Sequence, residues 1–196
     1  MNSIVEIRHQ AINNRKNISS QTKQNAQDQS TKHLKNLLEQ LQPQTVALYL
    51  STPDEMPTNT ILQTLLKQKI TVTLPVLHPF HSNTLVFQIF DTHTTTVTNR
   101  FNIQEPKLSC PNIIPITNID IFILPLTAFD RYGNRIGMGA GFYDRTLAGW
   151  RKHKSTRIGF AYECQKVEPI TPQPWDVPLD YIVTEKCTYK AQKPNI

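Results

Sequence analysis

Glycine is scarce in this chain and concentrated in one short segment. The 196 residues include six glycines, and none comes before Gly133. Four of the six lie between Gly133 and Gly141, inside the stretch from Asp130 to Arg145. Glycine tolerates positive φ and lets other groups approach the backbone closely. Residues 130–145 therefore predict a loop that holds a ligand against its backbone, and the rest of the fold has to support that loop.

The residues around these glycines indicate which ligand the loop holds. Gly137, Gly139 and Gly141 alternate directly before a predicted helix at residues 141–150. Backbone N–H groups of such a loop can converge on phosphate oxygens, and the free amides and dipole of the following helix add to this. Arg135 supplies a charged donor of fixed geometry. The segment therefore favours a nucleotide phosphate site.

Two carboxylates extend this interpretation to a metal. Asp144 falls in the first turn of the predicted helix, where it could hold Mg²⁺, which takes one or two carboxylates plus phosphate oxygens and water. Asp176, in the loop 174–178, is the candidate for the second carboxylate. Alternatively, Asp144 only complements the helix dipole and the glycines only shape a tight turn. The pattern is neither a Walker A loop, since no Gly-Lys-Ser/Thr follows, nor a dinucleotide fingerprint, since its spacing differs.

Apolar periodicity predicts an α/β fold. A strand at residues 45–50, a helix capped by Thr58 and a strand at residues 70–75 predict parallel strands joined by a right-handed crossover. Residues 119–125 form the most apolar strand, which we expect at the centre of the sheet, leading into the glycine-rich loop. We expect a mainly parallel sheet flanked by helices, a three-layer Rossmann-like single domain over residues 1–196.

Two helices are predicted before the sheet, the second capped by Ser19 or Ser20. They form an N-terminal helical arm, residues 1–42, on an α/β core of residues 43–196 with the nucleotide loop at 133–144. Further strands are predicted at residues 85–90, 157–161 and 179–184, and loops at residues 91–115 and 168–178.

Charge and cysteine content limit the other function classes. The net charge is +6, but Lys and Arg are scattered without a block of five, so we expect no nucleic-acid partner. The three cysteines are far apart and lack a CxxC spacing, which is typical of reduced thiols. No apolar run reaches the roughly 18 residues of a membrane span. We expect a cytoplasmic monomer that does not bind membranes.

Residues 129–145 closely resemble the signature of the 5-formyltetrahydrofolate cyclo-ligase family, also called 5,10-methenyltetrahydrofolate synthetase. That signature reads Phe-Asp-x-x-Gly-x-Arg-Leu-Gly-x-Gly-x-Gly-Tyr-Tyr-Asp-Arg. Supporting matches follow in order along the chain: Leu50 with Asp54, Glu55 and Thr58; Ile103 to Pro106; Asp120 to Pro125; Trp175-Asp176; and Leu179-Asp180. The resemblance implies an ATP- and Mg²⁺-dependent ligase that converts 5-formyltetrahydrofolate to 5,10-methenyltetrahydrofolate, releasing ADP and phosphate.

Roles carried over by position give the expected site. The implied catalytic residues are Arg135, Tyr143 and Asp144, and the implied metal ligands are Asp144 and Asp176. The implied nucleotide-binding residues are Arg8, Arg135, Ile136, Gly137, Met138, Gly139, Ala140, Gly141, Phe142 and Tyr143. The implied substrate-binding residues are Leu50, Glu55, Met138, Gly139, Ala140, Gly141 and Phe142.

The chain departs from the family pattern most clearly at Ile4. The family has a Lys four positions before Arg8, so one phosphate contact is lost or supplied by another residue such as Lys16 or Lys23. The sequence therefore predicts a raised KM for ATP, which Ile4→Lys should lower. The alternative function is a catalytically impaired nucleotide-binding module of the same fold, which the absent lysine would support.

Overall fold

The computed structural model describes residues 3–149, 152 and 154–192, and an eight-stranded sheet forms its centre. The strand order is β12–β11–β10–β7–β1–β2–β3–β6. The strands are β1 (Thr45–Ala47), β2 (Thr71–Leu77), β3 (Leu85–Ile89), β6 (Ile113–Ile114), β7 (Ile121–Leu124), β10 (Thr156–Phe160), β11 (Tyr181–Val183) and β12 (Thr188–Lys190). The strands from β11 to β2 run parallel, whereas β12, β3 and β6 add antiparallel edges. The predicted α/β fold with a mainly parallel sheet and a central β7 is confirmed.

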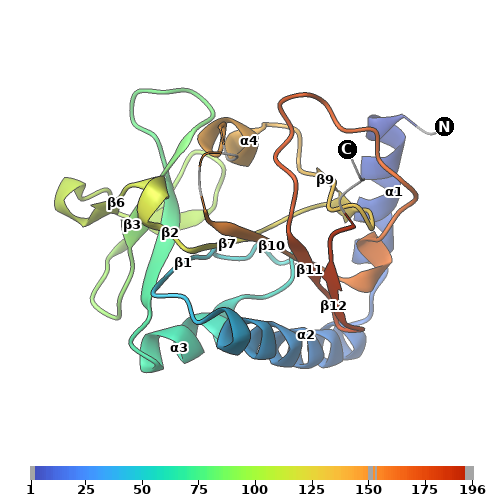
Figure 1. Cartoon of the computed structure of the whole chain (residues 1–196), viewed down its shortest axis with the longest axis horizontal. Helices are drawn as coiled ribbons and strands as arrows, with labels where there is room; N and C mark the ends of the chain where they lie inside the picture. The colour runs from blue at the N-terminus through green and yellow to red at the C-terminus, as the bar shows by residue number, and fades with distance from the viewer. Residues whose placement is uncertain (1–2, 150–151, 153, 193–196) are drawn as a thin grey trace.

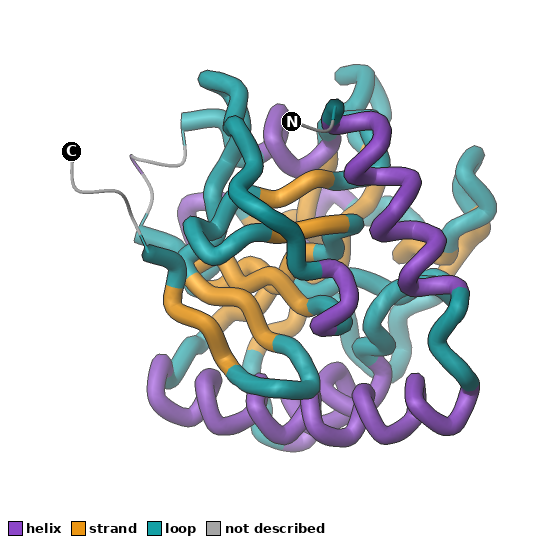
Figure 2. Tube along the Cα trace, turned by 90° about the vertical axis from the view of Figure 1, so that its right-hand side faces the viewer, coloured by secondary structure: helices purple, strands orange, loops and turns teal. Residues whose placement is uncertain are grey.

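Helices cover both faces of this sheet (Figure 1). They are α1 (Ile4–Lys16), α2 (Ser20–Leu41), α3 (Asn59–Lys67) and α4 (Phe142–Thr146). Figures 1 and 2 show α2 running along one face, next to α3, with α4 and α1 on the other side. None of the helices in the described ranges is long and apolar enough to cross a membrane.

Strand β7 shows why its sequence is continuously apolar. Ile121 and Ile123 belong to the buried cluster packed under α2 and α3, whereas Phe122 and Leu124 belong to the cluster on the opposite face. Successive strand residues point to opposite faces of a sheet. A strand covered by helices or loops on both faces therefore needs apolar residues at every position.

The strand and cap predicted around residues 45–58 need correction. Strand β1 ends at Ala47, although the Leu48 amide still donates to the Thr73 carbonyl at 2.9 Å. Thr58 stands at the N-cap position of α3 but its side chain makes no capping bond. Its hydroxyl instead donates to the Tyr49 carbonyl at 2.6 Å, which fixes the segment after β1.

The region predicted as loop at residues 91–115 contains a hairpin of β4 (Thr96–Thr98) and β5 (Gln104–Pro106), followed by β6. A second hairpin, β8 (Ala128–Phe129) with β9 (Arg135–Ile136), leads into the glycine-rich loop. These strands have two or three residues each, which is too short for an alternating apolar pattern to predict them.

The helix predicted at residues 141–150 is also shorter than expected. Helix α4 has five residues and ends at Thr146, and Trp150 lies outside the described residues. Gly149 adopts φ +78° beyond its end. Five residues make little more than one helical turn, so the aligned peptide dipoles add little here. The anion site predicted at this loop would therefore depend mainly on side chains and loop amides.

Candidate active site

Two cavities lie on either side of residues 141–144. The first, which we call the loop cavity, has a volume of about 600 Å³ and is lined by α1, β9, the glycine-rich loop and residues 173–176. The second, which we call the apolar cavity, has a volume of about 150 Å³ and is lined by the segments after β1 and β7, by residues of β2 and by the β4–β5 hairpin. Gly141 and Asp144 face the loop cavity, whereas Phe142 and Tyr143 face the apolar cavity.

The β8–β9 hairpin that carries Arg135 is held by a buried carboxylate. Asp130 accepts hydrogen bonds from the backbone and side-chain amides of Asn134 at 3.0 and 2.8 Å, and from the Ile170 amide at 2.8 Å. Gly133 lies in the turn with φ +85°, and a Cβ there would come within 2.5 Å of the Leu179 carbonyl oxygen. Only glycine fits this position without moving the backbone.

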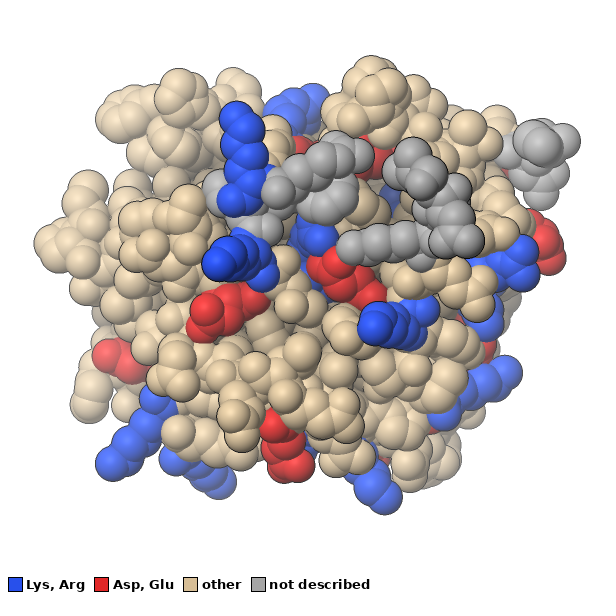
Figure 3. All heavy atoms as spheres, in the orientation of Figure 1, with Lys and Arg blue, Asp and Glu red and all other residues tan. Residues whose placement is uncertain are grey.

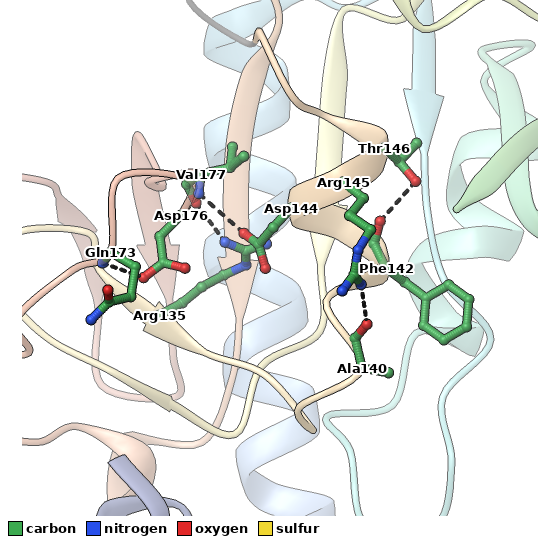
Figure 4. A network of polar contacts seen from close by, with 9 residues as sticks. All are labelled: Arg135, Ala140, Phe142, Asp144, Arg145, Thr146, Gln173, Asp176 and Val177. Carbon is green, nitrogen blue, oxygen red and sulfur yellow. Dashed lines mark hydrogen bonds and ion pairs between the residues drawn. The ribbon is translucent and has the colours of Figure 1, made fainter. Parts of the chain in front are cut away.

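Arg135 joins three segments at the edge of the loop cavity (Figure 4). Its Nη2 pairs with Asp144 Oδ1 at 2.9 Å, and its Nη1 donates to the Val177 carbonyl. The Val177 amide donates to the same Asp144 oxygen at 3.1 Å. The Arg135 side chain is only 5% exposed. With both terminal nitrogens engaged, Arg135 fixes the orientation of Asp144.

Asp144 and Asp176, the two predicted metal ligands, both line the loop cavity. Asp176 Oδ2 accepts the Gln173 amide at 2.8 Å, so each carboxylate has one oxygen held by a backbone amide. The other oxygen of each has no hydrogen-bond partner among the described residues. Within the same residues, no group of three or more His, Cys, Asp or Glu side chains forms a metal site by itself. The pair therefore fits a Mg²⁺ ion whose remaining ligands are phosphate oxygens and water.

Arg8 reaches the glycine-rich loop from α1. Its Nε donates to the Gly137 carbonyl at 2.9 Å across 129 residues of sequence. Ile4, one helical turn earlier, lines the same cavity. Lys16 is twelve residues further along the helix than Ile4, about 18 Å by the helical rise. Neither Lys16 nor Lys23 lines the cavity, so the structure brings neither of them to the position of the missing lysine.

The apolar cavity brings together Leu50, Glu55, Phe142 and Tyr143. The Glu55 carboxylate is fixed through Oε2, which accepts the Thr52 amide at 2.9 Å. Burial, with a further contribution from Glu55, raises the pKa of the Tyr143 phenol well above its usual value, although Arg135 opposes this. Tyr143 therefore stays protonated at physiological pH and can donate a hydrogen bond.

Glu105 is a second carboxylate in the apolar cavity that sequence reasoning did not assign a role. Its Oε2 accepts the Leu77 amide at 3.1 Å and the Asn99 side-chain amide at 2.9 Å. Phe101, from the same hairpin, packs edge-on against Phe142 with ring centroids 5.6 Å apart. The Ile-x-Glu-Pro match included Glu105, but only the folded β4–β5 hairpin shows that it lines the same cavity as Glu55.

The expected site residues thus divide between the two cavities. Of these, the residues that line the loop cavity are Arg8, Arg135, Ile136, Gly137, Gly139, Gly141, Asp144 and Asp176. Those that line the apolar cavity are Leu50, Glu55, Phe142 and Tyr143. Met138 and Ala140 line neither. Met138 is 67% exposed, and its sulfur accepts the Thr127 hydroxyl at 3.4 Å.

The family model and two similar curated proteins identify the same protein family. The model of the 5-formyltetrahydrofolate cyclo-ligase family matches residues 1–185. The 5-formyltetrahydrofolate cyclo-ligase of Haemophilus influenzae is 42% identical over 174 residues, which cover 89% of this chain and 93% of that protein. The Escherichia coli K12 protein of the same name is 44% identical over 140 residues, covering 71% of this chain and 77% of its own.

Solved structures show the same fold. The 5,10-methenyltetrahydrofolate synthetase of Aquifex aeolicus matches with a TM-score of 0.82 at 27% identity, covering 98% of this chain and 95% of that one. The synthetase of Mycoplasma pneumoniae matches with a TM-score of 0.75 at 24% identity, covering 94% and 99% respectively.

Proposed function

Because the chain belongs to the 5-formyltetrahydrofolate cyclo-ligase family, we propose that it uses ATP to convert 5-formyltetrahydrofolate to 5,10-methenyltetrahydrofolate. The observation that carries this proposal is the meeting of two chemically different cavities at residues 141–144. The arginines and carboxylates of the loop cavity suit a triphosphate with its metal. The apolar cavity, with two carboxylates, suits a ring that carries N–H donors. Holding the two substrates on either side of one turn brings their reacting groups together.

The chemistry consists of two displacements. The formyl oxygen attacks the γ-phosphorus, and the bond between that phosphorus and the ADP oxygen breaks. N10 then attacks the activated formyl carbon, phosphate leaves with the former formyl oxygen, and N10 gives up its proton. No protein nucleophile takes part, so catalysis consists of positioning and charge neutralisation.

On the nucleotide side, Arg8 and the amides of the glycine-rich loop bind phosphate oxygens. Asp144 and Asp176 would hold Mg²⁺, which offsets phosphate charge when it is bound. Arg135 keeps Asp144 turned toward the cavity. In this proposal Arg135 is therefore a positioning residue, whereas Asp144 is a metal ligand.

On the folate side, Leu50 and Phe142 pack against the pterin, and Glu55 and Glu105 accept hydrogen bonds from its amino and ring N–H groups. Each glutamate already has Oε2 held by a backbone amide, which leaves Oε1 for the ligand. Pre-oriented acceptors of this kind give specificity in a mostly apolar site. Tyr143, as a neutral phenol, can donate to the formyl group or a phosphate oxygen.

We also propose that the enzyme requires Mg²⁺ and acts as a cytoplasmic monomer without a nucleic-acid partner. The distribution of charge supports the last point. On the face drawn in Figure 3, Lys and Arg are scattered with Asp and Glu among them and form no broad basic patch. Nucleic-acid binding usually depends on such a patch.

One assay tests the proposed function. The protein is mixed with 5-formyltetrahydrofolate, ATP and Mg²⁺, and the absorbance of methenyltetrahydrofolate is followed. Product that requires both ATP and Mg²⁺ supports the ligase. Nucleotide binding without product would instead support a catalytically impaired nucleotide-binding module.

Glu105→Gln should raise the KM for 5-formyltetrahydrofolate by roughly tenfold, because a hydrogen bond to a charged group is worth about 1.5–3 kcal/mol. The KM for ATP should not change, because Glu105 lines only the apolar cavity. Steady-state kinetics with each substrate varied in turn measures both values. Glu39→Gln, at an exposed position on α2, is the matched control. An unchanged folate KM would remove Glu105 from the binding site.

A further inference from the structure

The loop cavity has few positive side chains with which to bind a triphosphate. Residues 136–144 include no Lys or Arg, and Ile4 occupies the position where the family pattern has a lysine. In the part of the chain that the structure describes, the cationic side chains lining this cavity are Arg8, Arg135 and Arg145. Among the described residues, a charge that replaces the missing lysine would come from one of these three arginines.

These three arginines differ in what they already bind. Arg135 is buried and paired with Asp144 at 2.9 Å, and its other terminal nitrogen is on the Val177 carbonyl. Its charge is therefore largely neutralised before a ligand arrives. Within the described ranges, Arg8 uses only Nε, on the Gly137 carbonyl, so both of its terminal nitrogens can bind a ligand.

Arg145 is exposed on α4, and its side chain turns back over the glycine-rich loop (Figure 4). One terminal nitrogen donates to the Ala140 carbonyl, which fixes where the guanidinium lies. The same nitrogen is 2.7 Å from the place where a side chain on Gly141 would begin, so glycine at 141 leaves room for it. Its Nε and Nη2 have no hydrogen-bond partner among the described residues.

We propose that Arg145 binds the phosphates of ATP and supplies the charge that Ile4 does not. This proposal rests on the proposed function, because it takes the ligand of the loop cavity to be ATP. A guanidinium presents five donors in a planar fork, which matches two phosphate oxygens at once. Arg8 reaches the loop at Gly137 and Arg145 reaches it at Ala140, so the two cations hold the triphosphate at both ends of the glycine-rich segment.

Arg145→Ala should raise the KM for ATP about tenfold or more, because a charge-assisted bond to phosphate is lost. The KM for 5-formyltetrahydrofolate should stay within about twofold. Arg145→Lys should recover part of the lost ATP affinity, since an ammonium keeps the positive charge but not the planar set of donors of a guanidinium. Titration with a fluorescent ATP analogue measures the same effect without turnover. It therefore tests Arg145 even if the methenyl assay gives no product.

A second substitution tests whether Arg145 and Ile4 serve the same ligand. Ile4→Lys placed in the Arg145→Ala variant should bring the ATP KM back toward the original value, since both positions line the loop cavity. Val5→Lys in the same background is the matched control, because Val5 is 57% exposed and does not line the cavity. An unchanged ATP KM in Arg145→Ala, or equal rescue by Ile4→Lys and Val5→Lys, would overturn the proposal.

Discussion

Asp144→Asn should lower kcat by at least about 100-fold, the usual scale for removing one electrostatic contact to a reacting group. The substitution keeps the size of the side chain but removes its negative charge. It therefore weakens both the proposed bond to Mg²⁺ and the pairing with Arg135. Methenyl formation at saturating ATP and folate measures kcat, and a Mg²⁺ titration shows how much of the loss a higher metal concentration recovers.

Two further variants separate a metal role from a structural one. Asp176→Asn should raise the Mg²⁺ concentration needed for half-maximal rate with a smaller fall in kcat, because Asp176 does not pair with Arg135. Asp28→Asn, at an exposed position on α2, should change neither quantity. If Asp144→Asn retained full activity, Asp144 would not belong to the metal site.

Sequence patterns predicted the two strands that deliver the residues of this site. The segment after β1 carries Leu50 and Glu55, and the chain after β7 leads to the glycine-rich loop. Strands β1 and β7 are parallel neighbours, so their carboxyl ends lie side by side. Ligands in such sheets bind at that edge. Apolar periodicity was sufficient to predict both strands because it is encoded locally, whereas the pairing of β1 with β7 joins distant segments and is shown only by the structure.

The division of residues between two cavities could not be predicted in the same way. Phe142 and Asp144 are two positions apart in one short helix, yet they face different cavities. Which way each side chain points depends on a turn that begins with Gly141 at φ +69°. The resemblance gave Phe142 nucleotide and substrate roles and gave Tyr143 nucleotide and catalytic roles, whereas both residues line the apolar cavity and not the loop cavity. Their contact with ATP stays a prediction.

Contacts between segments far apart in the chain also could not be predicted from the sequence. Arg135 was expected to bind phosphate, but the Val177 carbonyl that occupies one of its nitrogens lies 42 residues away. Glu105 lies in a region predicted as loop, and a three-residue strand pairing places it in the apolar cavity. Contacts between distant segments leave no periodic signal in either segment, so only the folded chain shows them.

Arg135→Ala should both destabilise the fold and impair catalysis. The Arg135 side chain is 5% exposed, and its removal leaves Asp144 and the Val177 carbonyl without their partner. Breaking a buried pair on one side costs about 3 kcal/mol or somewhat more. For a chain of this length, a loss of about 3 kcal/mol corresponds to roughly 6–12 °C in Tm. Thermal unfolding without ligands measures this effect.

The kinetic consequence distinguishes two roles for Arg135. If Arg135 positions Asp144, Arg135→Ala raises the Mg²⁺ concentration needed for half-maximal rate and lowers kcat. Arg135→Lys then recovers stability better than activity, because lysine lacks the planar guanidinium whose two terminal nitrogens bind both Asp144 and Val177. If Arg135 instead contacts phosphate directly, the substitution raises the ATP KM and leaves the Mg²⁺ requirement unchanged. Arg131→Ala, at an exposed arginine in the preceding turn, should change none of these values. A raised ATP KM with unchanged Tm and Mg²⁺ dependence would therefore reject the positioning role and restore the assignment implied by the family signature.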